Sequence, residues 1–193
     1  MRKIDDPVEG VKEWLGEASK LESDANAMSV ASVAEDGTPS SRIVLLKSID
    51  DGFVFYTNLG SQKGCEIKLN PKVALCFHWK STGRQIRIQG IAKTVSNEEA
   101  DSYFASRERE SQLAAWASEQ SKVIDNRKFL IDKLEYYRKE FEGKLVPRPR
   151  FWTGFRVLPS VIEFWDKKPS RLHERSLYFL SADGEWICDI LNP

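Results

Sequence analysis

Cysteine and histidine are scarce in this chain, and their scarcity narrows the kinds of site it can hold. The 193 residues include three cysteines, Cys65, Cys76 and Cys188, and two histidines, His78 and His173. The cysteines show no metal-type spacing and the histidines lie far apart in the sequence, so no metal site is expected. We expect the cysteines to be free thiols in a reducing cytoplasm.

An excess of charge and a long apolar run are also missing. Lys+Arg 29 balance Asp+Glu 29, and a general nucleic-acid or membrane-surface binder would need a basic excess. No apolar run approaches the roughly 20 residues that span a bilayer, and residues 1–6 do not read as a signal peptide. We therefore expect a cytoplasmic protein with neither nucleic-acid nor membrane partners.

Glycine-rich phosphate loops are a third absence. The chain contains neither G-x-G-x-x-G after a strand nor G-x-x-x-x-G-K-[ST], the two common loops that hold nucleotide phosphates through backbone N–H groups. A phosphorylated ligand would therefore have to be held by side chains.

What is present is the pattern of a mainly β protein with helices (α+β). Hydrophobic content of 41% and charged content of 30% suit one globular domain over residues 1–193. The periodicities predict strands at 28–34, 41–48, 53–57, 73–79, 84–95, 155–158, 161–165, 176–180 and 185–190. They predict helices at 7–21, 61–69, 96–107, 110–118 and 127–141. Turns at 35–37 and 50–52 suggest consecutive antiparallel hairpins, which favour a barrel-like sheet with helices packed outside.

A cationic stretch near the C-terminus is the first candidate for chemistry. In Arg171-Leu172-His173-Glu174-Arg175, an extended strand would place Arg171, His173 and Arg175 on one face. Two guanidinium groups beside an imidazole suit an anionic or electron-rich ring ligand. The alternative is an exposed polar strand face with Leu172 buried behind it.

Two further groups could bind anions. Arg42 and Lys47 bracket four apolar residues, and a separation of five puts them on opposite strand faces unless the strand bulges or ends. Residues 56–63 run from a strand end into a helix start, where Ser61, Lys63 and free N–H groups could hold a phosphate. The alternatives are a solvated strand and an ordinary helix cap with a surface lysine.

The third group is Tyr103, Arg107 and Ser111, spaced i, i+4 and i+8. If one helix continues through them, all three lie on one face, and all can donate hydrogen bonds to anionic oxygens. The alternative is a polar helix face. We expect His78, which alternates with Phe77 and Trp79, to be structural.

Taken together, these residues resemble the pyridoxine/pyridoxamine 5′-phosphate oxidase family, flavoproteins built on an antiparallel FMN-binding split β-barrel with peripheral helices. The most specific blocks are Arg-Ile-Val-Leu-Leu-Lys (42–47), Phe-Tyr-Thr-Asn-Leu-Gly-Ser (55–61), Trp116 with Gln120-Ser121, Phe151-Trp152, and Ile-Glu-Phe-Trp (162–165) with the cationic stretch at 171–175. The resemblance runs from about residue 28 to the C-terminus. Residues 1–27 would be an N-terminal helical segment, and residues 142–193 strands that complete the active site.

The resemblance also implies the roles of individual residues. FMN would contact Arg42, Ile43, Val44, Leu45, Leu46, Lys47, Tyr56, Thr57, Ser61, Gln62, Lys63, Gln85, Gln120, Ser121, Trp165 and Arg175. The substrate phosphate would be held by Lys47, Tyr103, Arg107 and Ser111, and the substrate ring by Arg171, Leu172 and His173, with Arg171 and His173 as catalytic residues. Gln62 departs from the arginine that is usual in the family.

The implied activity is oxidation of pyridoxine or pyridoxamine 5′-phosphate to pyridoxal 5′-phosphate, in vitamin B6 biosynthesis and salvage. A hydride would pass to the flavin, and O2 would be reduced to H2O2. The implied assembly is a homodimer with FMN at the subunit interface, acting on small phosphorylated B6 vitamers. Two alternatives stay open: an FMN oxidase for another ring, such as a phenazine-type precursor, and a non-catalytic flavin- or pyridoxal-phosphate-binding carrier.

Overall fold

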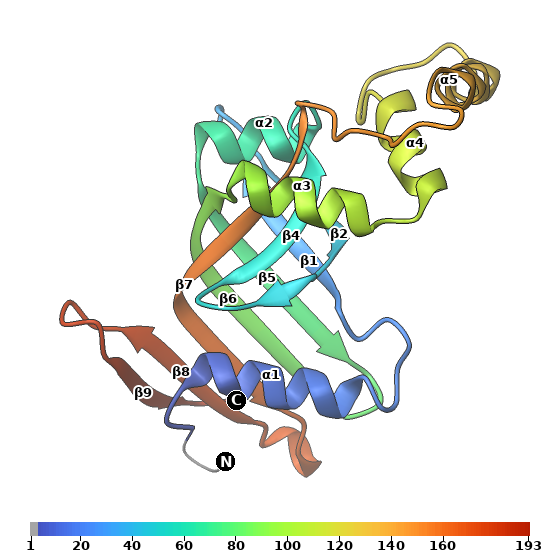
Figure 1. Cartoon of the computed structure of the whole chain (residues 1–193). Coiled ribbons are helices and arrows are strands. Elements are labelled where there is room, and N and C mark those ends of the chain that lie inside the picture. The colour runs from blue at the N-terminus through green and yellow to red at the C-terminus, as the bar shows by residue number, and fades with distance from the viewer. Residues whose placement is uncertain (1–3) are drawn as a thin grey trace.

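The computed structural model describes residues 4–193, and one antiparallel sheet organises them (Figure 1). Its strands are β1 (Ala27–Val33), β2 (Pro39–Leu45), β3 (Ser48–Ile49), β4 (Phe53–Asn58), β5 (Lys72–Trp79), β6 (Arg84–Thr94), β7 (Trp152–Asp166), β8 (Glu174–Leu180) and β9 (Trp186–Leu191). They pair in the order β2-β1-β5-β6-β7-β4-β3, while β8 pairs with β7 and β9 with β8. This mixture of antiparallel strands and outer helices confirms the predicted α+β class.

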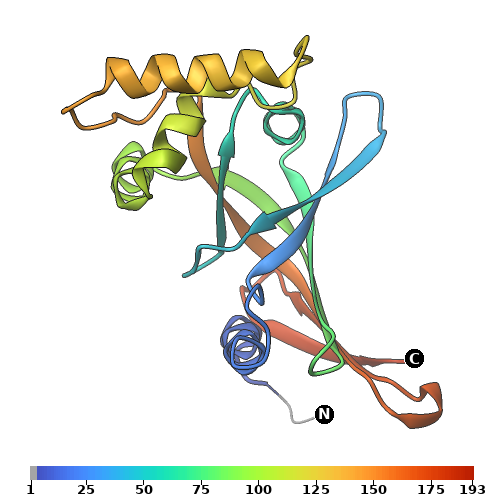
Figure 2. The same ribbon diagram turned by 90° about the vertical axis from the view of Figure 1, so that its right-hand side faces the viewer.

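The helices gather at the two ends of the sheet (Figures 1 and 2). They are α1 (Pro7–Ala18), α2 (Gln62–Leu69), α3 (Asn97–Ser106), α4 (Arg109–Ala117) and α5 (Arg127–Glu140), with a 3₁₀ turn at Pro169–Arg171. Helix α1 covers the lower end, where the Trp14 ring meets the Phe164 ring edge-on at 5.0 Å. Helices α2 to α5 lie at the upper end, so that end carries most of the helix termini.

The alternation of side chains along each strand determines which residues form the core. Side chains on successive residues of a strand point to opposite faces, and Ile86 and Ile88 of β6 are fully buried while Arg87 between them is exposed. Phe53, Phe55, Phe77 and Phe164, among others, fill the inner side with no exposed area. The outer face of β6 is therefore free to carry polar residues.

Strand β7 is long enough to serve two parts of the sheet. Its first half pairs with β4 and its second half with β8, and the register of its pairing with β6 shifts at Gln89/Gly90. A Cβ at Gly90 would lie 2.2 Å from the Leu158 oxygen, so this irregularity requires glycine. The two strands predicted at 155–158 and 161–165 are therefore one continuous strand.

The second predicted hairpin forms around the turn at 50–52, but its first strand is much shorter than predicted. Strand β1 does form a hairpin with β2, but β2 ends at Leu45, and the turn at 50–52 joins β4 to the two-residue strand β3. On its other edge, β4 pairs along its whole length with β7. Lys47 therefore lies beyond the end of β2, and face alternation no longer relates it to Arg42.

Candidate active site

A cavity of about 620 Å³ opens between β2, β4, α3 and α4. Eleven of the predicted site residues line it: Ile43, Val44, Leu45, Lys47, Tyr56, Thr57, Lys63, Tyr103, Arg107, Ser111 and Gln120. The remaining lining residues are Asn58, Glu108, Ala114, Ala115, Ser118 and Trp152. Residues from four separate stretches of the sequence thus meet in one place, with both predicted phosphate-binding groups represented.

Lys63 is a buried cation at the floor of this cavity. It is 7% exposed, and its Nζ lies 3.2 Å from Thr57 Oγ1, 3.4 Å from Gln120 Oε1 and 3.5 Å from Ser61 Oγ. No carboxylate among residues 4–193 forms an ion pair with it. Burial, followed by the charge of Arg42, lowers the pKa of Lys63. A buried ammonium held only by neutral oxygens is suited to receive an anion.

Arg107 is a half-buried cation in the same cavity. Its Nη1 is buried and makes no hydrogen bond to any residue that the structure describes. The guanidinium carbon lies 4.8 Å from the centre of the Trp152 ring, a cation–π contact, and burial lowers the pKa of Arg107. An unpaired buried N–H donor that lines a cavity is the expected signature of a missing acceptor.

No single helix runs through Tyr103, Arg107 and Ser111, so the condition under which they would share one helix face is not met. Helix α3 ends at Ser106, Arg107 is extended (φ −74°, ψ 151°), and α4 begins at Arg109. Gln112 of α4 donates to the carbonyls of Phe104 and Ala105 at 2.9 and 3.2 Å. These bonds satisfy the carbonyls that α3 leaves free at its end. The three side chains still line one cavity, to which α4 also contributes Ala114 and Ala115.

Stacked aromatic rings form one wall. The Tyr56 ring lies 4.0 Å from the Tyr103 ring and 5.2 Å from the Trp152 ring, both stacked. Burial and the neighbouring Glu99 carboxylate raise the pKa of Tyr56 to about 12, so its hydroxyl stays protonated near neutral pH. Sequence reasoning did not assign Trp152 to the site, although it belongs to the quoted Phe151-Trp152 block.

Arg42 and Gln62 face Glu66 and do not line the cavity. Arg42 donates to Ser32 Oγ at 2.5 Å and Ser40 Oγ at 2.6 Å, and its Nη2 lies 3.4 Å from Glu66 Oε2. The Gln62 amide donates to Glu66 Oε1 at 2.9 Å. Against the opposing effect of burial, hydrogen bonds from Ser32, Ser40 and Gln62 lower the pKa of Glu66 to about 2. The predicted contacts of Arg42 and Gln62 with FMN stay predictions.

Three other predicted residues lie at the edge of this region. Leu46 is 4% exposed and belongs to the main core. Ser61 caps α2 through a bond from Gly64 N to its Oγ, and Ser121 is exposed with a left-handed backbone (φ 71°). None of the three lines the cavity, although Ser61 Oγ lies 3.5 Å from Lys63 Nζ.

The other predicted residues form a second surface on the outer face of the sheet. Gln85, Trp165 and Arg175 lie directly opposite one another across β6, β7 and β8. Beside them is an open depression of about 540 Å³ lined by His78, Lys80, Gly83, Trp165, Lys167, Arg171 and His173. Leu172 is 68% exposed. We use the name row surface for Gln85, Trp165 and Arg175 together with Leu172 and the residues that line this depression.

The expectation of one strand through Arg171, His173 and Arg175 is wrong. Arg171 lies in the 3₁₀ turn with φ 61°, and β8 begins only at Glu174. The His173 ring packs against Trp165 at 4.5 Å, and its Nδ1 accepts a hydrogen bond from the Lys168 backbone N–H at 3.2 Å. In neutral His173 the proton is therefore on Nε2, which leaves that nitrogen as a donor.

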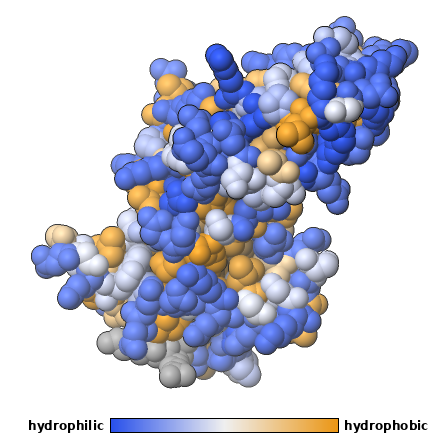
Figure 3. All heavy atoms as spheres, viewed as in Figure 1, coloured by the Kyte–Doolittle hydropathy of each residue, from blue (hydrophilic) through white to orange (hydrophobic). Residues whose placement is uncertain are grey.

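The cavity and the row surface lie at opposite ends of the sheet. Helices α3 and α4 stand at the upper end, whereas β8 and the turn before it lie at the lower end (Figure 1). One subunit therefore does not bring the two groups together. Apolar residues also show across the middle of the face seen in Figure 3, between hydrophilic ends. Separately, the strand β2 exposes two apolar side chains, Ile43 (67%) and Leu45 (43%).

Comparison with known proteins shows which family has this sequence and fold. Residues 15–140 match the family described as pyridoxamine 5′-phosphate oxidase, and residues 152–193 match the pyridoxine 5′-phosphate oxidase C-terminal dimerisation region. A pyridoxine/pyridoxamine 5′-phosphate oxidase of Pelagibacter ubique is 49% identical over 191 residues, 97% of this chain and 92% of that protein. No helix in residues 4–193 has the length and apolar character needed to cross a membrane.

Two solved structures are similar in fold. PhzG from Burkholderia lata, in complex with tetrahydrophenazine-1-carboxylic acid, has a TM-score of 0.93 at 30% identity and covers 100% of this chain and 95% of its own. A pyridoxamine 5′-phosphate oxidase-related, FMN binding protein of Nostoc punctiforme has a TM-score of 0.80 at 15% identity, covering 99% of this chain and 100% of its own. The protein is thus a split-barrel protein of the pyridoxamine 5′-phosphate oxidase type. Its sequence narrows that class further: the chain belongs to the pyridoxine/pyridoxamine 5′-phosphate oxidase family.

Proposed function

We propose that this protein is an FMN-dependent oxidase that converts pyridoxine or pyridoxamine 5′-phosphate to pyridoxal 5′-phosphate. The observation that carries the proposal is a pair of cations, buried Lys63 and half-buried Arg107, which line one cavity without a carboxylate partner among residues 4–193. Two cations on separate elements suit two phosphates, one on the cofactor and one on the substrate. FMN, when bound, supplies a ring that accepts a hydride and passes the electrons to O2, giving H2O2.

Lys63 and its neighbours would hold the FMN phosphate. Its Nζ and Thr57 Oγ1 both lie within hydrogen-bond distance of each other and of the acceptor Gln120 Oε1, so these two donors are ordered before a ligand arrives. Ordered donors reduce the entropy lost on binding. The side chains of Ile43, Val44 and Leu45 line the same cavity and offer an apolar edge to the flavin ring.

Arg107, Tyr103, Ser111 and Lys47 would hold the substrate phosphate. All four line the cavity, and each can donate to an anionic oxygen. The Tyr103 ring is held in its stack with Tyr56 at 4.0 Å, which fixes the direction of its hydroxyl. The phosphate contact would orient the vitamer and so place its reacting carbon for hydride loss.

The row surface of a second subunit would complete the cavity in a homodimer. That surface carries Gln85, Trp165, Arg171, His173 and Arg175, and its C-terminal strands fall within the dimerisation region of the family. His173 would donate from Nε2 to the substituent of the substrate ring, since Nδ1 is occupied by the Lys168 N–H. The Arg171 guanidinium would orient the ring by a planar charged contact.

The test of this proposal is the substrate dependence of Arg107→Ala. The variant is expected to raise KM for pyridoxine 5′-phosphate tens-fold, because a charged hydrogen bond is worth about 1.5–3 kcal/mol. Its FMN content should stay unchanged, since Lys63 is intact. Unphosphorylated pyridoxine is expected to be a poor substrate of the parent protein, and its turnover should be indifferent to the change. Equal activity of the parent on both forms would contradict the phosphate site.

A second candidate is oxidation of a phenazine-type ring, which the 0.93 TM-score with PhzG favours. A substrate with a carboxylate and no phosphate could still meet Arg107. The discriminating assay compares tetrahydrophenazine-1-carboxylic acid with pyridoxine 5′-phosphate, following H2O2 from each. Turnover of the phenazine alone would replace the first candidate. Binding of vitamers without peroxide would instead indicate a non-catalytic carrier.

A further inference from the structure

Glu163 is a buried carboxylate that neither phosphate site uses. It lies on β7 and is 6% exposed, which is rare for a carboxylate without partners. Its Oε2 accepts a hydrogen bond from Arg87 Nη1 at 3.0 Å, and its Oε1 accepts one from Arg175 Nε at 2.9 Å. Both carboxylate oxygens are thus occupied by guanidinium groups.

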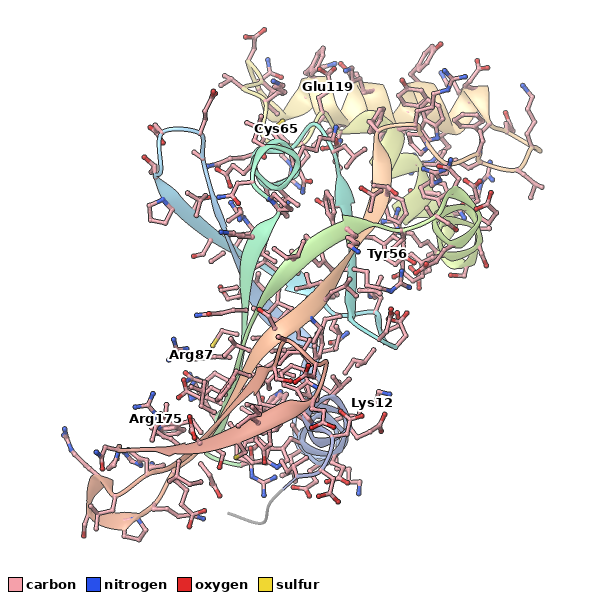
Figure 4. The ribbon with its side chains drawn as sticks, turned by 90° about the vertical axis from the view of Figure 1, so that its left-hand side faces the viewer. Lys12, Tyr56, Cys65, Arg87, Glu119 and Arg175 are labelled. Atoms are coloured by element: carbon pink, nitrogen blue, oxygen red, sulfur yellow. The ribbon has the colours of Figure 1, made fainter. Side chains whose placement is uncertain are left out.

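The sheet register explains why these three charges meet. Arg87 of β6 lies directly opposite Glu163, and Arg175 of β8 lies opposite Trp165, two residues further along β7. Residues two apart on a strand share a face, so Glu163 and Trp165 point the same way. Figure 4 shows Arg87 and Arg175 projecting on the same side of the sheet.

The contacts fix the Arg175 guanidinium on several atoms. Besides the Nε bond, Nη2 lies 2.9 Å from Glu163 Oε1, and Nη1 donates to the Asn192 carbonyl at 2.9 Å. The Arg175 side chain keeps 25% of its area exposed, whereas that of Glu163 keeps 7%. Arg175 can therefore still meet a ligand, while Glu163 reaches one only through Arg175.

We propose that Glu163 is a positioning residue that holds Arg175 beside Trp165 in the orientation in which it binds FMN. The inference rests on the proposed function, because it takes FMN as the ligand of Arg175. A free arginine side chain samples many rotamers, and ordering it lowers binding affinity. Glu163 removes that loss by ordering Arg175 in advance. Arg87 neutralises the second carboxylate oxygen and is not needed for the orientation.

The experiment is a titration of FMN into ligand-free protein, followed by quenching of flavin fluorescence. Glu163→Gln keeps the size of the side chain and removes its charge, and it is expected to weaken the Kd roughly tenfold. In an Arg175→Ala background the same change is expected to weaken the Kd less than about twofold, because the residue it acts through is gone. A purely structural role would lower thermal stability without this dependence on Arg175.

Two control variants make the comparison specific. Arg87→Gln removes the other guanidinium partner of Glu163, and Glu110→Gln removes an exposed carboxylate paired with Arg138 on distant helices. Both are expected to keep the Kd within about twofold of the parent. If Glu163→Gln does not fold, Glu163→Asp keeps the charge, shortens the reach to Arg175 and should give the same loss.

The outcomes separate this inference from the function on which it rests. A parent protein that takes up no FMN overturns the proposed function and the role of Glu163 together. A parent that binds FMN while Glu163→Gln binds equally well overturns only the role of Glu163. Equal losses in Arg87→Gln, or losses that simply add in the double variant, would overturn it as well.

Discussion

At the scale of single residues, ligand binding and stability oppose each other at Lys63. The ammonium is 7% exposed, and burial lowers its pKa, which means that the folded protein disfavours the charged form. Lys63→Met is therefore expected to stabilise the ligand-free protein by about 1–2 kcal/mol. Added FMN should raise the Tm of the parent but not of the variant. Lys122 is exposed, and Lys122→Met serves as the control. It should change neither the Tm of the ligand-free protein nor the Tm with added FMN.

Glu66 makes a prediction about acid stability. Its pKa falls from 4.5 to about 2, so the stability it contributes is present above pH 4.5 and is lost as the pH falls towards 2. Glu66→Gln should therefore lower the free energy of unfolding at neutral pH, and the difference from the parent should shrink below pH 4.5. Urea midpoints of both proteins across this range measure it. A difference that stays constant with pH would contradict the assignment.

At the scale of elements, the turn at Pro169–Arg171 carries backbone strain. Ser170 and Arg171 are consecutive non-glycine residues with φ of 56° and 61°, a region that costs about 1–3 kcal/mol per residue. Ser170→Ile should destabilise the protein by about 1–2 kcal/mol, since a branched side chain resists this conformation. Ser170→Gly should cost nothing measurable in urea unfolding. If both variants unfold alike, the left-handed conformation is absent in solution.

Elements with a purely local signal were predictable from the sequence. Ser-Asn-Glu-Glu at 96–99 has the capping-box pattern that marks a helix start, and in the structure Ser96 Oγ accepts from Glu99 N at 3.1 Å where α3 begins. The predicted end of this helix at 107 also lies within one residue of the observed end at Ser106. Whether one helix continues to Ser111 stayed open in the sequence, because no glycine or proline separates the two helices. In the structure Gln112 reaches back from α4 to the Phe104 carbonyl, a contact that spacing along the chain could not reveal.

At the scale of the whole molecule, each active site should need two subunits. Arg107→Ala damages the cavity and His173→Ala damages the row surface, which lie at opposite ends of one chain. Neither homodimer then has an intact site, whereas a mixed dimer has one. Co-expression of both variants should restore activity to about a quarter of the parent, given random pairing. No recovery in isolated mixed dimers would show that a single subunit forms the site.

This arrangement also explains which part of the site the sequence could predict. Residue chemistry indicated anion binding at Lys63 and Arg107, and the structure brings both to one cavity. Residue chemistry could not show that Arg171 and His173 lie far from this cavity, because the distance between the two ends of the chain's sheet depends on how the strands pair. Residue chemistry also could not show that Arg42 faces Glu66. The residue type does not say whether an arginine on a strand will pair with a carboxylate of the protein or with a ligand.

Strand β7 sets a limit on how the gene for this protein can change in length. One continuous strand leads from Trp152 beside the cavity to Trp165 on the row surface. Inserting two codons between them would keep every side chain on its original face, yet it would move one end by about 6.6 Å along the strand. A deletion would shorten the span equally. In the proposed dimer the cavity and the row surface would then no longer meet, so the length of β7, apart from its composition, sets the spacing on which the shared site depends.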